Sequence, residues 1–268
     1  MSDLIPIYSI SKPFLAEAVL ALDISLDTEI GQYLPGLHDC YKNRLVANIL
    51  NHTSGLDDYI DMPEYHEAVK AHQPAWSRDY LLNLASRRTH NNVGFHYSNI
   101  GYLLLVLLIE KQTQHPYFEA ISELVLTPLD IQGFEPWLTR HPSIPNYDPH
   151  WVFSGTFLGD PKLIASSVMK LARHRQASIG LSVGITPLSY RDTGFEEPGY
   201  GIGFMSDGGW VDSEPRYVGH GGGGPGFSLM ALVNTSNWKS ELAYSTGEFD
   251  QKKAIVDLIN KMEGQEEL

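Results

Sequence analysis

The chain of 268 residues has a single cysteine and far fewer basic than acidic residues. Cys40 has no second cysteine to pair with, so an internal disulfide is excluded, and no cysteine cluster suggests zinc. Its 19 Lys and Arg against 32 Asp and Glu give a formal net charge of −13. Because so acidic a chain repels phosphate backbones, we expect no nucleic-acid partner.

Long apolar runs and a targeting segment are also missing. The most apolar stretch, YLLLVLLIE at 102–110, is shorter than the ~20 residues that span a bilayer, and it predicts a buried helix. The opening MSDLIPIYS has neither the basic start nor the apolar run of a signal peptide. We therefore expect no membrane span and a cytoplasmic location, with a periplasmic or secreted one left open if the N-terminus is incomplete.

Several enzyme motifs are absent. The chain has no G-x-S-x-G, which argues against an α/β-hydrolase, and no G-x-x-x-x-G-K-[ST] phosphate loop. HEAVK at 66–70 fails the zinc motif H-E-x-x-H at its last residue. We expect Asp57, Asp58 and Asp61 to form a solvated loop, with a calcium site as the remote alternative. His52 is expected to be structural and to cap a turn. No cofactor and no metal are expected.

The apolar pattern predicts helices first and a sheet afterwards. Helical spacing favours helices over 12–22, 44–56, 77–88, 99–113, 116–129, 161–174 and 250–262. The segment 133–161 predicts a long ordered loop, and the runs after about 195 predict antiparallel strands. The fold class is therefore α+β. Residues 1–25 and 196–268 would form the sheet region, with a helix-rich region, 26–195, inserted between them in one continuous unit.

The pattern S-x-x-K occurs three times, as Ser9–Lys12, Ser167–Lys170 and Ser236–Lys239. A serine hydroxyl needs a base to become a nucleophile, and a lysine three residues on lies on the same helix face. Burial can lower the pKa of that lysine. Ser9–Lys12 opens an apolar helix, whereas we expect the second copy on a helix surface and the third in a hairpin turn. Ser9 is therefore the candidate nucleophile.

Two further features have the chemistry of a cleft. Y-x-N occurs as Tyr41–Asn43, predicted to be a loop between charges, and as Tyr97–Asn99, directly before the buried helix. Tyr97 and Asn99 flank one residue, so both can point the same way and supply a base and an amide hydrogen bond. In GHGGGGPGF (219–227) the glycines would weaken a packed strand, but they suit a backbone that approaches a ligand. A flexible loop or tight hairpin is the alternative.

Together, SISK, YSN and HGG resemble the ordered motifs of the serine β-lactamase and penicillin-binding-protein family: S-x-x-K, Y-x-N, and K-T-G or H-x-G. The connecting segments ILNHTSGL and YGIGF resemble that family too, and the likeness runs from about residue 5 to 260. It is closest to the class C β-lactamase branch with its esterase and D-aminopeptidase relatives. The resemblance implies a β-lactamase/transpeptidase-like fold, with an antiparallel sheet, flanking helices and a helix-rich region.

The resemblance also implies roles for single residues. Ser9 would be the acylated nucleophile, Lys12 its proton partner, and Tyr97 the general base and proton shuttle. The substrate would be bound by Asn99, His220, Gly221 and Gly222, and the oxyanion hole would be formed by the backbone N–H groups of Ser9 and Gly223. The implied activity is hydrolysis of an ester, amide or β-lactam carbonyl, in a small molecule or peptide, through a covalent acyl-enzyme.

One departure from the family pattern bears on the substrate. Lysine and threonine in K-T-G help to hold a carboxylate, whereas His220 has an ordinary pKa near ~6.5 and Gly221 has no hydroxyl. We therefore expect an esterase or peptidase rather than an efficient β-lactamase. Loops 57–76 and 133–160 are expected to shape the pocket.

A second departure concerns the sheet. Family members carry a helix and two strands before S-x-x-K, and this chain has eight residues there. We expect those N-terminal strands to be missing, which would leave about three strands and a bare edge that a homo-oligomer could cover. The alternative function is a non-catalytic relative that binds ligand without turnover. The joint presence of Ser9, Lys12 and Tyr97 favours catalysis.

Overall fold

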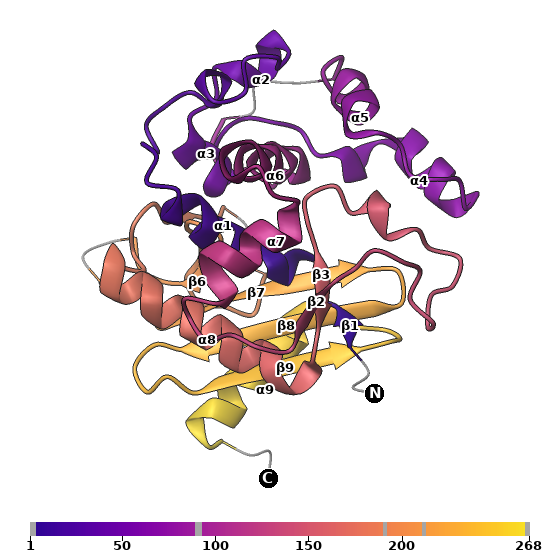
Figure 1. Ribbon diagram of the computed structural model, residues 1–268. Coiled ribbons are helices and arrows are strands. Elements are labelled where there is room, and N and C mark those ends of the chain that lie inside the picture. Colours follow the sequence, from indigo (N-terminus) through magenta and orange to yellow (C-terminus); the bar gives the residue numbers. More distant parts are fainter. Residues whose placement is uncertain (1–3, 89–92, 190–191, 211–212, 266–268) are drawn as a thin grey trace.

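The computed structural model describes residues 4–88, 93–189, 192–210 and 213–265. Figure 1 shows a helical layer above a sheet, with α8 lying along the sheet. The helices are α1 Ser11–Ala21, α2 Asp39–Lys42, α3 Val46–Leu50, α4 Pro63–Lys70, α5 Arg78–Ala85, α6 Asn99–Thr113, α7 Tyr117–Ile121, α8 Pro161–Ser178 and α9 Gln251–Glu263. Over the described residues, no helix combines the length and apolar character needed to cross a membrane.

The strands form two antiparallel sheets. The larger has the order β4-β5-β6-β7-β8-β9, and the smaller has the order β1-β3-β2. Their bounds are β1 Ile5–Pro6, β2 Phe134–Pro136, β3 Phe157–Gly159, β4 Thr186–Pro187, β5 Pro198–Tyr200, β6 Met205–Asp207, β7 Tyr217–Gly224, β8 Phe227–Asn234 and β9 Ser240–Ser245. Strand β9 ends the order, and among the described residues it pairs only with β8.

Strand β8 is buried on both faces, which explains its nearly continuous apolar sequence. Its alternate residues Leu229, Ala231 and Val233 belong to the main core. Met230 and Leu232 belong to a second cluster with residues of α9. Because successive side chains of a strand point to opposite faces, this sheet separates the two cores.

Helix α6 lies at the centre of the helical layer and is apolar on all sides. The side chain of Ser98 caps it by accepting a hydrogen bond from the N–H of Gly101 at 3.1 Å. The N–H of Ser98 donates in turn to Nδ1 of the buried His52. This cap fixes where Asn99 enters the first turn of α6.

A buried ion pair joins α1 to α8. The Nε of Arg175 donates to Glu17 at 2.7 Å, and its Nη1 donates to the carbonyl of Ile202 at 2.7 Å. Both side chains of the pair are almost fully buried. The pair therefore holds α1, which starts beside Ser9, against the sheet-covering helix.

Glycines let β7 approach the 3-10 turn Tyr8–Ile10, which carries Ser9. A Cβ at Gly222 would lie 2.4 Å from the carbonyl oxygen of Ile7, and a Cβ at Gly224 would lie 2.3 Å from the ring of Tyr8. No side chain fits in either place. Two of the four consecutive glycines are thus required by packing, which the sequence interpretation did not include. The tight hairpin that it gave as an alternative is confirmed, because only Pro225 and Gly226 separate the paired strands β7 and β8.

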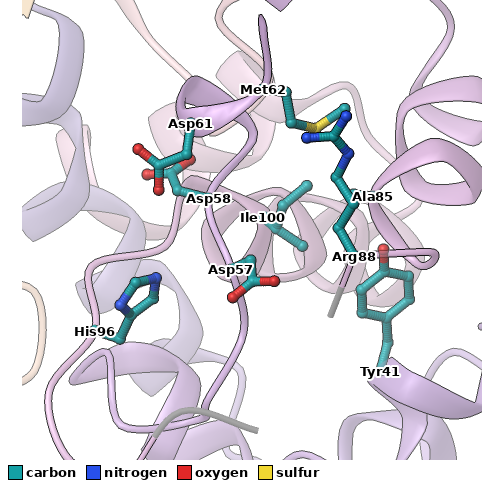
Figure 2. Close-up of a pocket in the computed structure, with 9 residues that line it drawn as sticks. All are labelled: Tyr41, Asp57, Asp58, Asp61, Met62, Ala85, Arg88, His96 and Ile100. Atoms are coloured by element: carbon teal, nitrogen blue, oxygen red, sulfur yellow. The ribbon is translucent and has the colours of Figure 1, made fainter. Parts of the chain in front are cut away.

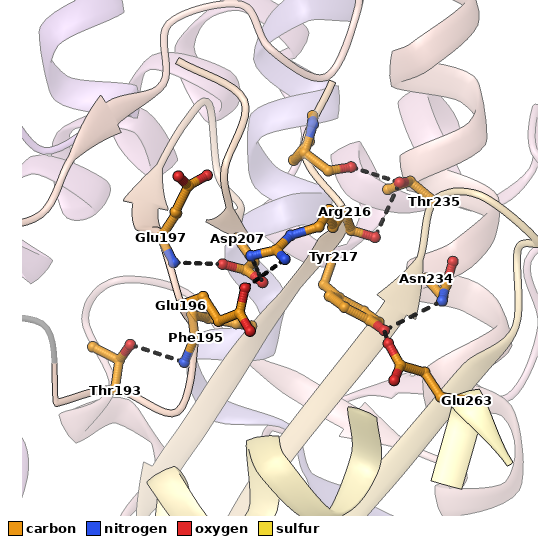
Figure 3. A network of polar contacts seen from close by, with 11 residues as sticks. Thr193, Phe195, Glu196, Glu197, Asp207, Arg216, Tyr217, Asn234, Thr235 and Glu263 are labelled. Atoms are coloured by element: carbon orange, nitrogen blue, oxygen red, sulfur yellow. Dashed lines mark hydrogen bonds and ion pairs between the residues drawn. The ribbon is translucent and has the colours of Figure 1, made fainter. Parts of the chain in front are cut away.

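A polar network surrounds the start of β7, at Arg216 and Tyr217 (Figure 3). The guanidinium of Arg216 pairs with Glu196 at 2.6 Å and with Asp207 at 3.0 Å. The hydroxyl of Tyr217 donates to Glu263 at the end of α9 at 2.5 Å. These contacts tie β6, β7 and α9 together.

The helices at 99–113 and 161–174 and the strands after 195 are confirmed, but three expectations are wrong. The predicted helix 44–56 stops at Leu50, because His52 takes a left-handed φ of 59°. The segment 133–161 contains β2 and β3, and the larger sheet has six strands where about three were expected. The division at residues 25 and 195 stays a prediction. Helix α8 and strand β4, which precede residue 195, lie with the sheet.

Removing Arg175 tests the buried ion pair. Arg175→Met leaves the carboxylate of Glu17 buried without its partner, and we expect a loss of about 3–5 kcal/mol in unfolding free energy. Urea denaturation measures it. Lys253→Met is the matched control, because Lys253 and Asp257 form an exposed pair on α9 that should contribute little. Equal losses in the two variants would contradict the role of the buried pair.

Adding a methyl group to β7 tests the glycine contact. Gly222→Ala would clash with Ile7, and we expect a lower melting temperature and a loss of about 1–3 kcal/mol. Gly223→Ala is the control, because a Cβ there meets nothing within 4 Å and its φ is not left-handed. If both variants melt like the wild type, the close packing is not required.

Candidate active site

Ser9 lies in the 3-10 turn that leads directly into α1. The preceding residue, Tyr8, has a left-handed φ of 47°, which is unfavourable for a residue with a side chain. Its hydroxyl donates to the carbonyl of Pro225 at 2.6 Å, just after β7. Tyr8 thus ties the turn to the sheet and leaves the half-buried Ser9 facing a cleft.

Lys12 is fully buried, and its amine lies among partners that suit a proton acceptor. Its Nζ is 3.1 Å from the Oγ of Ser9 and 2.8 Å from the Oδ1 of Asn99. The ring centroids of Tyr97 and Tyr102 lie 5.0 and 4.9 Å away. Burial lowers the pKa of Lys12 to about 7, while the carboxylate of Asp58 acts in the opposite direction. A neutral fraction is therefore available near neutral pH.

Asn99 is placed differently from the substrate-binding role that the resemblance implies. Its side chain is buried; the Oδ1 accepts from Lys12, and the Nδ2 donates to the Oδ2 of Asp58 at 2.9 Å. Asn99 is not among the cleft-lining residues. Both ends of its amide are therefore engaged inside the protein.

His220 is a neutral imidazole in a defined tautomer. Its Nδ1 lies 2.6 Å from the carbonyl oxygen of Gly221, which can only accept, so Nδ1 carries the hydrogen. Its Nε2 then accepts from the hydroxyl of Tyr200 at 2.9 Å. Burial, with the nearby charge of Lys12, lowers the pKa of His220 to about 3. It carries no positive charge at neutral pH.

The cleft beside Ser9 has a volume of about 350 Å³. Its lining comes from the Ser9 turn, the segment before α6, the residue after β4, strands β5 to β8 and the start of α9. The lining residues are Ser9, Phe95, Tyr97, Leu188, Tyr200, Met205, His220, Gly221, Gly222, Gly223, Ser228, Phe249 and Gln251. None of them is Lys, Arg, Asp or Glu. The expectation that loops 57–76 and 133–160 shape this pocket is wrong.

One backbone edge of β7 faces the cleft. Strand β6 pairs with β7 only from Tyr217 to Gly219, so 220–224 has no strand partner on that side among the described residues. Gly221 to Gly223 line the cleft there, and the position where Gly223 would carry a Cβ is open. A carbonyl group next to Ser9 can therefore approach the backbone without meeting a side chain.

The other motif copies have structural contacts. Ser167 is buried and donates to the carbonyl of Leu163, so its expected surface position is wrong, whereas the side chain of Lys170 is exposed as expected and pairs with Asp130. Ser236 lies in the turn between β8 and β9, as expected, and donates to Asn234. Tyr41 belongs to α2 rather than a loop, and its buried hydroxyl donates to the carbonyl of Leu82.

Asp58 is the residue that sequence reasoning missed. It was expected in a solvated acidic loop, but only 5% of it is exposed. Figure 2 shows Asp57, Asp58 and Asp61 around a second pocket of about 280 Å³. No pattern in the sequence distinguishes Asp58 from the other two. In the described part of the chain, no three His, Cys, Asp or Glu side chains are grouped to hold a metal ion.

His52 has the structural role that was expected, because its Nδ1 accepts from the N–H of Ser98 and its carbonyl accepts from the N–H of His96. Its ring also packs against that of Tyr97, with centroids 4.3 Å apart. Burial lowers the pKa of His52 well below its ordinary value. The neutral imidazole of His52 thus packs against the ring of Tyr97.

Comparisons with solved structures show a shared fold. A D-stereospecific amidohydrolase from Streptomyces sp. superimposes with a TM-score of 0.75 at 23% identity, over 96% of this chain and 86% of that one. The D-amino acid amidase from Ochrobactrum anthropi SV3, complexed with D-phenylalanine, also gives 0.75, at 20% identity over 98% and 93%. An octameric penicillin-binding protein homologue from Pyrococcus abyssi gives 0.73, at 19% identity over 98% and 67%.

Sequence comparison gives the family. Penicillin-binding protein 4* of Bacillus subtilis (strain 168) is 25% identical over 287 residues, which cover 93% of this chain and 62% of that protein. The chain thus spans about three fifths of this relative's length. The family described as Beta-lactamase matches residues 2–267. With the S-x-x-K, Y-x-N and H-G-G segments placed together around Lys12 and the cleft, the chain belongs to the Beta-lactamase family.

Proposed function

We propose that this protein is a serine hydrolase that forms an acyl-enzyme at Ser9 and cleaves an uncharged amide or ester. The observation that carries the proposal is the 3.1 Å contact between Ser9 and a fully buried lysine at the edge of an open cleft. A buried amine with a lowered pKa can take the hydroxyl proton, which makes the serine a nucleophile.

The proposed reaction starts with neutral Lys12. Its nitrogen takes the proton of Ser9 as the Oγ attacks the substrate carbonyl. The negative oxygen would then be stabilised by the backbone N–H groups of Ser9 and Gly223. Collapse of the tetrahedral intermediate expels the amine or alcohol, which receives the proton through Lys12 and Tyr97. Water hydrolyses the ester of Ser9 by the same proton path in reverse.

We give the role of general base, which the resemblance implied for Tyr97, to Lys12, because its amine lies 3.1 Å from Ser9. Tyr97 stays the proposed shuttle because it lines the cleft and its ring lies 5.0 Å from the amine of Lys12. His220, Gly221 and Gly222 are proposed to contact the substrate from β7. We do not propose substrate binding for Asn99, because its amide already bonds Lys12 through the oxygen and Asp58 through the nitrogen. Its proposed role is the contact with Lys12. It stays part of the proposed machinery.

The lining of the cleft supports an uncharged substrate with an apolar acyl group. Phe95, Leu188, Met205 and Phe249 supply apolar surface, and among the described residues the lining has no ionic side chain that could pair with a carboxylate or an ammonium group. The neutral His220 offers no cationic replacement. These features favour an esterase or amidase over an efficient β-lactamase. The fold shared with D-amino acid amidases agrees with amide cleavage.

Self-association also stays a proposal. Strand β9 is the last strand of the larger sheet, and an unpaired strand edge can pair with a second copy. The Pyrococcus abyssi homologue with the same fold is octameric.

Labelling with a fluorophosphonate tests the nucleophile. We expect wild-type protein to gain the mass of one adduct and Ser9→Ala to gain none. Ser236→Ala, which alters another S-x-x-K, is the control and should label like the wild type. If wild-type protein stays unlabelled, or if Ser9→Ala is labelled equally, the acyl-enzyme proposal fails and the non-catalytic alternative is favoured.

The pH dependence of this labelling tests Lys12. Only the neutral amine can accept the proton, so the rate should rise with pH through about 7, where Lys12 loses its proton. Lys12→Met should abolish the rise along with most of the labelling. A wild-type rate that is constant between pH 5 and 9 would exclude Lys12 as the base.

A matched ester pair tests the substrate charge. We expect p-nitrophenyl hexanoate to be cleaved with a kcat/KM at least about tenfold above that of the adipate monoester, whose added carboxylate would be desolvated without a partner. Steady-state absorbance assays measure both, with spontaneous hydrolysis subtracted. Equal values for the two esters would contradict an uncharged substrate.

A further inference from the structure

Asp58 is connected to Lys12 by two hydrogen bonds through Asn99, and its side chain lies in a different pocket from the cleft of Ser9. It opens the short 3-10 turn Tyr59–Asp61, where its Oδ1 accepts the N–H of Ile60 at 3.3 Å. Its Oδ2 accepts the Nδ2 hydrogen of Asn99 at 2.9 Å. Both carboxylate oxygens are therefore bonded to N–H donors, and the side chain lines the second pocket rather than the cleft (Figure 2).

An ionised carboxylate dictates how the neighbouring amide is oriented. Asp58 can only accept hydrogen bonds, so Asn99 must turn its NH2 group toward Asp58 and its carbonyl toward Lys12. The reverse orientation would place two oxygens against each other. Asp58 thus selects one of the two orientations that the amide could otherwise adopt.

This orientation matters for the base. A neutral lysine amine has two hydrogens and one lone pair. With the carbonyl of Asn99 accepting one hydrogen at 2.8 Å, the lone pair stays available for the hydroxyl of Ser9 at 3.1 Å. A reversed amide would donate an N–H to Lys12 and compete with Ser9 for the lone pair.

We propose that Asp58 is a positioning residue that keeps the lone pair of Lys12 directed at Ser9 by fixing the amide of Asn99. The inference deepens the proposed serine hydrolase and depends on it. Asp58 touches neither substrate nor nucleophile, and the family motifs quoted above do not include it.

Several titratable groups surround Asp58. Burial raises the pKa of Asp58 to about 6, and the hydrogen bonds from Ile60 and Asn99, together with the charge of Lys12, act in the opposite direction. The groups facing it are Lys12 of α1, Asp61 and Tyr59 of its own turn, Tyr65 of α4, and Asp57, Arg88 and His96 around the pocket. Above about pH 6 Asp58 is ionised, which covers the range in which Lys12 becomes neutral.

Asp58→Asn is the decisive variant because it keeps shape and removes one acceptor. Ile60 and Asn99 donate to different oxygens of Asp58, and an asparagine has an oxygen at only one of these positions, so Asn99 should lose its fixed orientation. We expect fluorophosphonate labelling of Ser9 to slow by about tenfold or more. Asparagine is also favoured at the start of a helical turn, so the melting temperature should change little. Asp61→Asn removes the same charge from the same turn, is exposed, and should label within about twofold of the wild type.

The pH profile adds a readout that a purely structural role would not change. The charge of Asp58 raises the pKa of Lys12, so its removal should move the midpoint of the labelling profile to lower pH while the plateau rate falls. Asn99→Ala removes the other partner of the Asp58–Asn99 hydrogen bond. On the plateau, where Lys12 is already neutral, the charge of Asp58 no longer matters and both residues act through one amide. The plateau rate of the double variant should therefore be no lower than that of Asn99→Ala alone.

The outcomes separate the two proposals. If the wild type is labelled but Asp58→Asn keeps its plateau rate, whatever its midpoint, the positioning role is overturned and the hydrolase proposal stands. The positioning role would also be overturned if the fold-losses in plateau rate of the two single variants multiplied in the double variant. It would be overturned as well if Asn99→Ala were labelled like the wild type, a test that does not require Asp58→Asn to fold. A wild type that is never labelled overturns both proposals.

Discussion

The complete burial of the Lys12 amine is the constraint on which this site depends. An amine without water must find acceptors and aromatic faces nearby, or it would destabilise the fold. Here it finds Ser9 in the turn before its own helix, Asn99 on α6, and the rings of Tyr97 and Tyr102. Helices α1 and α6 must therefore lie side by side, and the cap of α6 at Ser98 sets the height at which they meet. The chemistry of the site and the packing of the core share the same contacts.

Much of this arrangement could be predicted from the sequence because its signals are local. Helix α6 has the predicted bounds, since an apolar run with a serine cap specifies a buried helix without help from the rest of the chain. The motifs Ser9–Lys12, Tyr97–Asn99 and His220–Gly223 meet around one place, as their order in the family implied. Spacing on a helix or beside a helix start was enough to identify these residues.

Other features depend on contacts between distant segments. Strands β4, β5 and β6 are two or three residues long, too short for an alternating pattern, so the number of strands was underestimated. Asp58 stands beside two similar aspartates, and its burial and its contact with Asn99, 41 positions away, are not visible in the sequence. The glycines of β7 had two local explanations, whereas their close packing depends on Ile7 and Tyr8 at the other end of the chain.

The contact between the Ser9 turn and β7 has a consequence for folding. The hydroxyl of Tyr8 reaches the carbonyl of Pro225, 217 residues away in sequence, and the glycines seat the same turn. Closing so long a loop is entropically costly and comes after local helices have formed. A chain that has not yet docked its β7–β8 hairpin therefore lacks the contacts that order the turn of Ser9, the proposed nucleophile. Ser9 would become reactive only when the fold is complete. A newly made or partly unfolded chain would therefore not be acylated at Ser9 by electrophiles that it meets in solution.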